Sequence, residues 1–148
     1  MVSRGDVDEF SVVQIPTGKV TRWWDLIRGG IETIIAKNRI TFRPEDVYVT
    51  LAKNAATLCL TLDSRGMYAG FTILTQERNP FTQENYLMVW FAYSKVRGAS
   101  EGTMPHLEKI GRELGYSLLI MHSPRKGWER TAVKLGFSLR EVVWQKRL

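Results

Sequence analysis

Short apolar segments along the chain follow two different periods. Segments rich in β-branched and aromatic residues, bounded by Gly, Pro, Asn or Asp, predict six strands. These strands are expected at residues 10–15, 55–63, 68–76, 86–93, 116–121 and 137–145. The segment 86–93, YLMVWFAY, is almost wholly apolar, which predicts a buried strand.

Apolar residues that recur at helical spacing predict four helices between these strands. The helices are expected at about 20–37, 44–53, 103–114 and 126–135. Gly29 and Gly30 lie inside the first helix, and each glycine costs about 1 kcal/mol relative to alanine, so a bend or break is expected there. Pro44 suits the first position of the second helix. Gly115 and Gly136 suit the ends of the third and fourth helices.

The predicted elements follow the order β-α-α-β-β-β-α-β-α-β, in one domain over 1–148 with a loose tail over 1–9. The turn Asp63–Gly66 predicts a hairpin between the second and third strands. A strand, a helix and a second strand in succession form a right-handed parallel unit, so 116–121 should lie parallel to 86–93. The predicted fold class is therefore α/β with a mixed sheet.

The loop between the strand 86–93 and the helix 103–114 contains Arg97-Gly98-Ala99-Ser100-Glu101-Gly102. The first N–H groups of a helix have no partner within the helix, and the helix dipole is positive at that end. Glycine in such a loop lets the backbone approach a phosphate closely. With Thr103 as the cap and Pro105 in the first turn, the loop predicts an anion site. The alternative is that the glycines of the loop only form a turn.

Charge favours a polyanionic ligand without identifying it. The chain has 148 residues, of which 44% are hydrophobic, and a net charge of +6. The basic residues are concentrated after His122. Such an excess suits coenzyme A, nucleic acid or an ordinary solvated face. No recognisable helix-turn-helix or zinc pattern supports a nucleic acid partner.

The composition also indicates in which cellular compartment the protein is expected. The single cysteine, Cys59, excludes an internal disulfide and a multi-cysteine metal site, and it predicts a reducing cytoplasm. No apolar run is long enough to span a bilayer, and the N-terminus lacks the apolar core of a signal peptide. We therefore expect neither a membrane partner nor a metal.

The loop also resembles a family motif. Arg97, Ser100 and Gly102 fall on the R/Q-x-x-G-x-G/A pyrophosphate motif of the GNAT acyltransferase superfamily, with serine where the motif has its first glycine. Gly-Tyr at 115–116 and Leu-Gly-Phe at 135–137 extend the likeness through the C-terminal half. The resemblance implies a GNAT fold, in which two central parallel strands diverge and a β-bulge in the earlier strand helps to open the gap.

The resemblance further implies that the pantetheine arm of an acyl-CoA, acetyl-CoA in the first instance, lies in that gap with its pyrophosphate on the loop. The residues that would hold this co-substrate come from the strand, the loop and the start of the last helix. They are Phe91, Ala92, Tyr93, Arg97, Gly98, Ala99, Ser100, Glu101, Gly102, Thr103, Ser123 and Arg125.

Acyl transfer to an amine sets further requirements. An alkylammonium ion, with a pKa of about 10.4, must lose a proton before it attacks, and a backbone N–H usually stabilises the oxyanion. Glu84, where some family members place a glutamate, and its neighbour Glu77 are candidate bases. His122, at the end of strand 116–121, is a third candidate, acting directly or through water.

The family's usual tyrosine acid falls on Ala132, which has no proton to give. Either the thiolate leaves unassisted, or Tyr93 assists it, or catalysis has been lost. The sequence thus predicts an acyl-CoA-dependent N-acyltransferase for an amine acceptor, a protein or a small molecule. The segment 127–137, GWERTAVKLGF, also resembles small acetyltransferase-like proteins of short-tailed bacteriophages. That likeness implies the alternative of a GNAT-shaped protein that binds and modulates a host protein in the host cytoplasm.

Overall fold

The computed structural model describes residues 9–38, 41–122 and 128–148. The strands are β1 Ser11–Ile15, β2 Thr57–Leu62, β3 Tyr68–Arg78, β4 Asn85–Ser94 and β5 Leu119–Met121. The helices are the 3-10 helix η1 Thr17–Trp23 and the α-helices α2 Trp24–Asn38, α3 Pro44–Ala52, α4 Ala99–Glu113 and α5 Trp128–Lys134. The order of elements agrees with the predicted order as far as α5.

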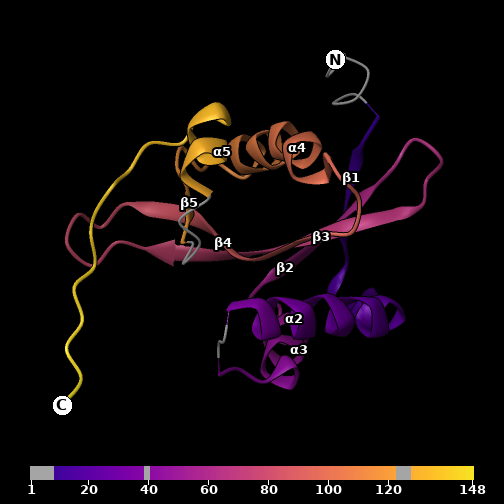
Figure 1. Ribbon diagram of the computed structural model, residues 1–148, viewed down its shortest axis with the longest axis horizontal. Helices are drawn as coiled ribbons and strands as arrows, with labels where there is room; N and C mark the ends of the chain where they lie inside the picture. Colours follow the sequence, from indigo (N-terminus) through magenta and orange to yellow (C-terminus); the bar gives the residue numbers. More distant parts are fainter. Residues whose placement is uncertain (1–8, 39–40, 123–127) are drawn as a thin grey trace.

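The five strands form one sheet in the order β1-β2-β3-β4-β5. The first three pairings are antiparallel, and β4 pairs with β5 in parallel, as the helical connection between them predicted. Helices α2 and α3 cover one face of the sheet, and α4 and α5 cover the other (Figure 1). The predicted α/β class with a mixed sheet is confirmed.

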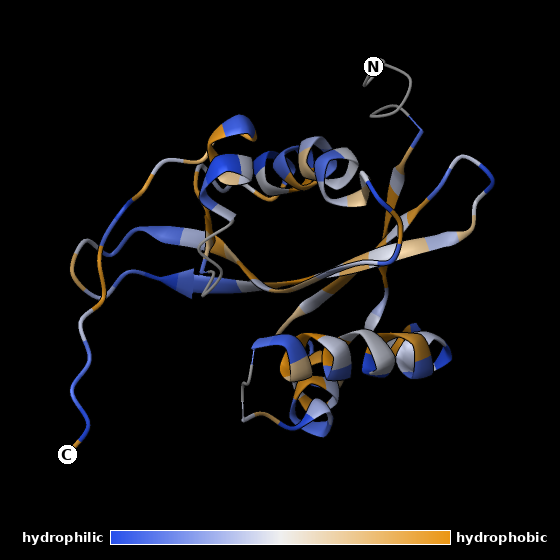
Figure 2. Ribbon diagram, viewed as in Figure 1, coloured by the Kyte–Doolittle hydropathy of each residue, from blue (hydrophilic) through white to orange (hydrophobic). Residues whose placement is uncertain are grey.

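Each face of the sheet carries its own core, because successive strand residues point to opposite sides. In β2, Leu58 and Leu60 pack with α2 and α3, whereas Cys59 packs with α4. The apolar sides of the helices turn toward the sheet, as Figure 2 shows. Each large apolar side chain buried in this way stabilises the fold by roughly 1.5–3 kcal/mol.

Two helix predictions are corrected by the structure. Helix α2 runs through Gly29 and Gly30 without the expected break. A side chain at position 30 would overlap the ring of Phe71, so the glycine there permits close packing of α2 on the sheet. Helix α4 begins at Ala99, four residues before the predicted start, and Pro105 therefore lies inside the helix instead of in its first turn.

The sixth strand, predicted at 137–145, is not formed. Residues 137–148 leave α5 as an extended, largely exposed segment that pairs with none of the described strands. A strand requires a neighbour to accept its hydrogen bonds, and β-forming residues alone do not supply one. The segment passes the β3–β4 turn (Figure 1), where Arg140 lies 3.5 Å from Glu84. No helix among the described residues is long and apolar enough to cross a membrane.

Candidate functional site

Strands β4 and β5 are paired along only part of their course. The pairs are Leu87–Leu119, Met88–Ile120 and Val89–Met121. Beyond Val89, β4 continues to Ser94 on its β3 side, but no described residue pairs with it on the β5 side. Met121 is the last residue of β5, so from Trp90 to Ser94 the β5 side of β4 faces no described strand. This stretch beside β4 is called the gap below.

A β-bulge lies at the start of this gap. In the β3–β4 register, Leu74 is opposite Val89 and Ile73 is opposite Phe91, which leaves Trp90 as the extra residue on β4. Trp90 and Phe91 consequently both pack toward the α2 side of the sheet. A bulge of this kind bends the strand and increases its local twist.

The bulge also sets which β4 residues face α4. Ser94 lies on the α4 side, and its Oγ is 2.6 Å from the Oγ of Ser100 in the first turn of α4. Tyr93 lies on the opposite side, with its ring stacked on Phe71 at a centroid distance of 5.7 Å. Alternate residues of this stretch thus reach the two faces of the sheet.

A narrow cleft of about 40 Å³ lies between β4, the end of β5 and α4. It is bordered by β4 at Ala92 and Ser94, by Met104 of α4, by Met121 of β5 and by Trp128 of α5. Ligand pockets commonly hold about 300–1,000 Å³, so a substrate arm must displace some of these side chains. Methionine side chains are flexible enough to move aside.

The N-terminus of α4 opens at the end of this cleft. Gly98, at the cap position, has φ +86°, and no side chain caps the helix. The backbone N–H groups of Arg97, Gly98, Ser100 and Glu101 donate to no acceptor among the described residues. Unpaired amides at the positive end of a helix dipole form a binding site for an anion.

The remaining residues of the predicted loop are used for packing. Ala99 N–H donates to the carbonyl of Val96 at 3.2 Å, and Gly102 N–H donates to the carbonyl of Gly98 at 3.0 Å. A side chain at Gly102 would overlap the ring of Phe10. Gly102 therefore lets β1 approach α4, and it offers no free amide to a phosphate.

Thr103 does not cap α4, because it lies in the second turn. Its hydroxyl donates to the carbonyl of Ala99 at 2.6 Å, and its Oγ1 lies 2.6 Å from the Oγ1 of Thr61 in β2. Both threonines are buried. The hydroxyl of Thr103 thus takes part in two hydrogen bonds that hold α4 on the sheet.

Charges of both signs surround the free amides. Lys95 and Arg97 are exposed in the β4–α4 connection, and Glu101 is exposed in the first turn of α4. Lys95 lies over the Tyr68 ring, with Nζ 5.9 Å from its centroid, and thus points away from α4. Arg97 is therefore the cation best placed to attract an anion bound at these amides. The Glu101 carboxylate, in contrast, repels such an anion.

Solved acetyltransferases share the fold of this chain at low sequence identity. A ribosomal-protein-alanine N-acetyltransferase from Brucella melitensis biovar Abortus 2308 is 14% identical, with a TM-score of 0.67 over 94% of this chain and 99% of that chain. A predicted acetyltransferase from Clostridium acetobutylicum, solved with acetyl-CoA, is 11% identical, with a TM-score of 0.67 over 93% and 96% of the two chains.

A third structure is an aminoglycoside acetyltransferase from an uncultured soil metagenomic sample, in complex with sisomicin. It is 11% identical, with a TM-score of 0.68 over 95% of this chain and 96% of that chain. The chain has the GNAT fold. No protein-family model matches the sequence, and no curated protein matches it. These three descriptions name no bacteriophage, so the phage origin stays a prediction.

One feature expected of the GNAT fold, the bulge in the earlier strand, is present here. His122 directly follows Met121, at the mouth of the gap, and is exposed. Glu84 lies in the β3–β4 turn, six residues or about 20 Å along the strand from Trp90. Glu77 pairs with Tyr86 near that same end. The structure therefore brings His122, and neither carboxylate, close to the gap.

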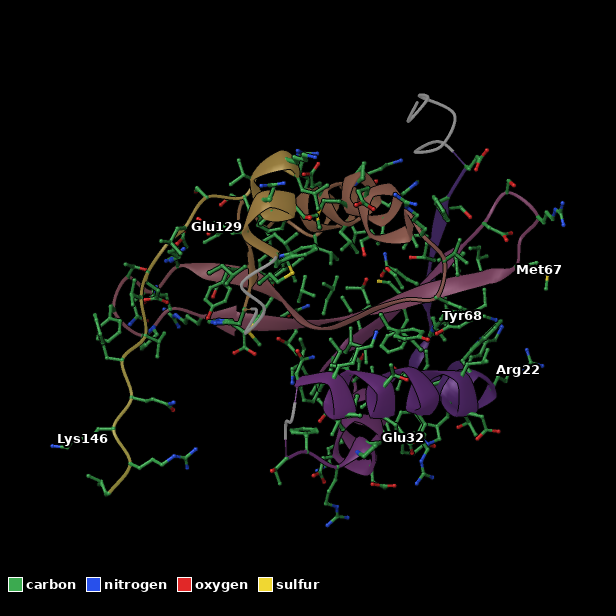
Figure 3. The ribbon with its side chains drawn as sticks, viewed as in Figure 1. Arg22, Glu32, Met67, Tyr68, Glu129 and Lys146 are labelled. Carbon is green, nitrogen blue, oxygen red and sulfur yellow. The ribbon has the colours of Figure 1, made fainter. Side chains whose placement is uncertain are left out.

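Tyr93 lies on the α2 side of the sheet, in a group of aromatic residues that includes Tyr68, whose side chain lies between β3 and α2 (Figure 3). Burial, and secondly the charge of Tyr93, raise the pKa of Tyr68 to about 12. The Tyr68 hydroxyl has no hydrogen-bond partner among the described residues. This phenol remains neutral near pH 7 and can donate a hydrogen bond.

The structure adds three residues that the sequence did not indicate: Ser94, Met121 and Trp128. Their position depends on the bulge and on where β5 ends, which no local pattern specifies. Ser123 and Arg125 lie outside the described residues. Ala132 is half-buried in α5, as expected for a side chain without a polar group. No group of three or more potential metal ligands occurs in the described ranges.

Proposed function

We propose that the protein is an acyl-CoA-dependent N-acyltransferase that uses acetyl-CoA to acylate an amine. One observation carries the proposal: β4 extends beyond the end of β5 next to the α4 N-terminus, where the amides of Ser100 and Glu101 have no acceptor among the described residues. The likeness to acetyltransferase structures, one of them solved with acetyl-CoA, supports the same conclusion.

In this proposal, Arg97 and the free amides of 97, 98, 100 and 101 bind the pyrophosphate. Backbone groups of Phe91, Ala92 and Tyr93 bind the acyl-pantetheine arm along the unpaired edge of β4. Such an edge offers N–H and C=O groups to an amide-containing chain, much as a sheet edge binds a peptide. An N–H at the bulge is suited to stabilise the negative oxygen that forms on the acyl carbon.

His122 is the proposed base. Its imidazole stands at the mouth of the gap and accepts the proton of the attacking ammonium, directly or through water. The amine nitrogen then forms the new bond to the acyl carbon, and the bond from that carbon to sulfur breaks. Ala132 cannot protonate the departing sulfur, so it leaves as a thiolate or takes a proton from the phenol of Tyr93.

The proposal specifies the acceptor only by its chemical class: an amine on a protein or on a small molecule. Among the neighbours, one is described as a ribosomal-protein-alanine N-acetyltransferase, and another is an aminoglycoside acetyltransferase in complex with sisomicin.

Binding is tested first by thermal unfolding with acetyl-CoA. A ligand at 100 times its Kd stabilises the native state by about 2.7 kcal/mol, which raises the melting temperature by several degrees. We expect Arg97→Glu to abolish this rise. Arg43→Glu makes the same charge change beside α3, on the other face of the sheet, and should leave the rise unchanged. Absence of any rise at millimolar acetyl-CoA would overturn the proposal.

A second candidate function is a GNAT-shaped protein that binds and modulates another protein without turnover. Ala132 favours it, because the usual proton donor is absent, and so does the small volume of the cleft. Release of free thiol from acetyl-CoA with amine acceptors separates the two functions. Binding without thiol release, across protein and small-molecule amines, would favour the non-catalytic function.

A further inference from the structure

The bulge in β4 gathers aromatic side chains on the α2 side of the gap. Trp90 and Phe91 both face this side, and Phe42, which precedes α3, packs against each of them. The centroid of the Phe42 ring lies 5.8 Å from that of Trp90 and 5.7 Å from that of Phe91, in edge-to-face arrangements. Phe91 is buried, whereas Trp90 and Phe42 are half-buried. Parts of these two rings are therefore accessible to a ligand.

The aromatic surface continues from Trp90 along β4 to the start of β3. Tyr93 stacks on Phe71, and Tyr68 lies between β3 and α2 (Figure 3). The Nζ of Lys95 stands 5.9 Å from the centroid of the Tyr68 ring, so an ammonium group of the chain itself lies over this surface. The electron-rich face of an aromatic ring attracts such a cation, and an indole attracts it most strongly. The ammonium group of a ligand meets the same attraction at Trp90.

The part of the chain that covers this side carries an excess of positive charge. Residues 17–53 contain seven basic and four acidic residues. Two of the acidic residues, Glu32 and Glu45, pair with Arg28 at 3.0 and 3.1 Å. The other two stand in the first turns of α2 and α3, where they oppose the positive ends of the helix dipoles. The net positive charge of this side disfavours a ligand that carries several ammonium groups.

The proposed position of the co-substrate leaves the aromatic side of the gap free. In the proposed function, the acyl-pantetheine arm follows the unpaired edge of β4. The cleft at that edge lies on the α4 side, where Ser94, Met104 and Met121 border it. An acyl group held at the bulge then has one face toward this cleft and the other toward Trp90. The attacking nitrogen approaches from the face that the arm does not occupy, so the acceptor enters beside Trp90.

We propose, on the basis of the function proposed above, that the acceptor is a monoamine with an aromatic group near its amino nitrogen, and that Trp90 selects it. The aromatic group packs on the rings of Trp90 and Phe42, and the ammonium group is attracted to the face of the indole before it loses its proton. Polyamines and aminoglycosides are poor acceptors, because their further ammonium groups meet the positive charge of residues 17–53.

The acceptor preference of the wild-type protein tests this class. In thiol release from acetyl-CoA, kcat/KM should be about tenfold higher for phenethylamine than for n-butylamine, spermidine or sisomicin. Equal or higher values for the other amines would overturn the inference and leave the acyltransferase function in place. Thiol release with none of them, while acetyl-CoA still raises the melting temperature, would also overturn the inference alone. Absence of that rise would overturn the proposed function itself.

Variants of Trp90 test whether this residue selects the acceptor. Trp90→Leu keeps an apolar side chain for the core but removes the ring, so it should raise the KM for phenethylamine about tenfold and leave that for n-butylamine unchanged. Trp90→Phe restores a ring and should recover most of the preference. Trp144→Leu is the matched control, because Trp144 is 89% exposed in the segment after α5.

A merely structural role of Trp90 gives a different result. The rise in melting temperature with acetyl-CoA should persist in all three variants, which establishes that each is folded and binds the co-substrate. An unchanged preference for phenethylamine in Trp90→Leu, an equal loss of turnover with both monoamines, or the same loss of preference in Trp144→Leu would contradict selection by Trp90. The wild-type comparison of amines decides the acceptor class even if Trp90→Leu does not fold.

Discussion

The hydroxyl oxygens of Thr61 and Thr103 lie 2.6 Å apart in the buried layer between β2 and α4. Thr103 donates its own proton to the carbonyl of Ala99, so the Thr61 hydroxyl is the donor in this pair. The chain of two hydrogen bonds fixes the first turn of α4 to the sheet. The free amides of Ser100 and Glu101 are held in place by the same turn.

Thr103→Val should lower the free energy of unfolding by about 1–3 kcal/mol, because it leaves the buried Thr61 hydroxyl without an acceptor. Urea unfolding measures this change. Thr103→Ser keeps the hydroxyl and should recover most of the loss. The double variant Thr61→Val, Thr103→Val should be more stable than the sum of the single losses predicts, because it leaves neither hydroxyl unpaired. Strict additivity would show that the two hydroxyls do not interact.

Adjacent glycines in α2 should respond oppositely to alanine. An added Cβ at Gly29 meets no atom within 4 Å, so Gly29→Ala should stabilise the helix by up to about 1 kcal/mol. An added Cβ at Gly30 overlaps the Phe71 ring and presses on Tyr93, so Gly30→Ala should destabilise the protein by about 1–3 kcal/mol. Thermal unfolding of the pair measures both changes. Stabilisation by both substitutions would contradict the packing of α2 on β3 and β4.

Local chemistry made much of the fold predictable. Gly115 and Gly136 end their helices with φ of +86° and +90°, where glycine carries no steric penalty. Pro44 begins α3, and the hairpin between β2 and β3 turns at Gly66 with φ +75°. In each case, the residue type itself specifies the backbone conformation, so no distant contact is needed to infer it.

What the residues alone did not predict is decided by distant contacts. The segment 86–93 is almost wholly apolar, so no alternation reveals that the facing reverses at Trp90. Helix α4 starts at Ala99, where Ala99 and Gly102 are small enough to pack against Phe10 and Ala69, a contact across the chain. The loop predicted to bind an anion does precede α4, but the helix start determines which of its amides are free.

Cys59 should be inert in the folded protein. Burial raises the pKa of its thiol from 9.0 to about 12, so very little reactive thiolate exists at pH 8. We expect slow reaction with a disulfide reagent in buffer and rapid reaction in urea. Because the folded pKa is the higher one, this group's contribution to stability is full below pH 9 and is lost as pH rises toward 12. Rapid labelling of the native protein at pH 8 would show that the β2 layer opens readily.

Glu101→Gln should tighten acetyl-CoA binding by about two- to fivefold. The Glu101 carboxylate stands in the first turn of α4, beside the amides proposed to bind the pyrophosphate, and repels it. Isothermal calorimetry at low salt measures the difference in Kd. Glu113→Gln, at the opposite end of the same helix, is the control and should leave the Kd unchanged. Equal effects of both substitutions would indicate a response to net charge and not to the amides.

His122→Gln should reduce kcat about 100-fold and leave the acetyl-CoA-dependent rise in melting temperature unchanged, because the imidazole is proposed to take a proton and not to hold the phosphates. Steady-state thiol release with a fixed amine acceptor measures kcat. His106→Gln is the control, since the His106 Nε2 lies 3.0 Å from the carbonyl oxygen of Phe10 on the far side of α4 and should alter stability more than turnover. Unchanged turnover in His122→Gln, with the control also unaffected, would remove the histidine from the mechanism and leave proton transfer to water or to the phenol of Tyr93.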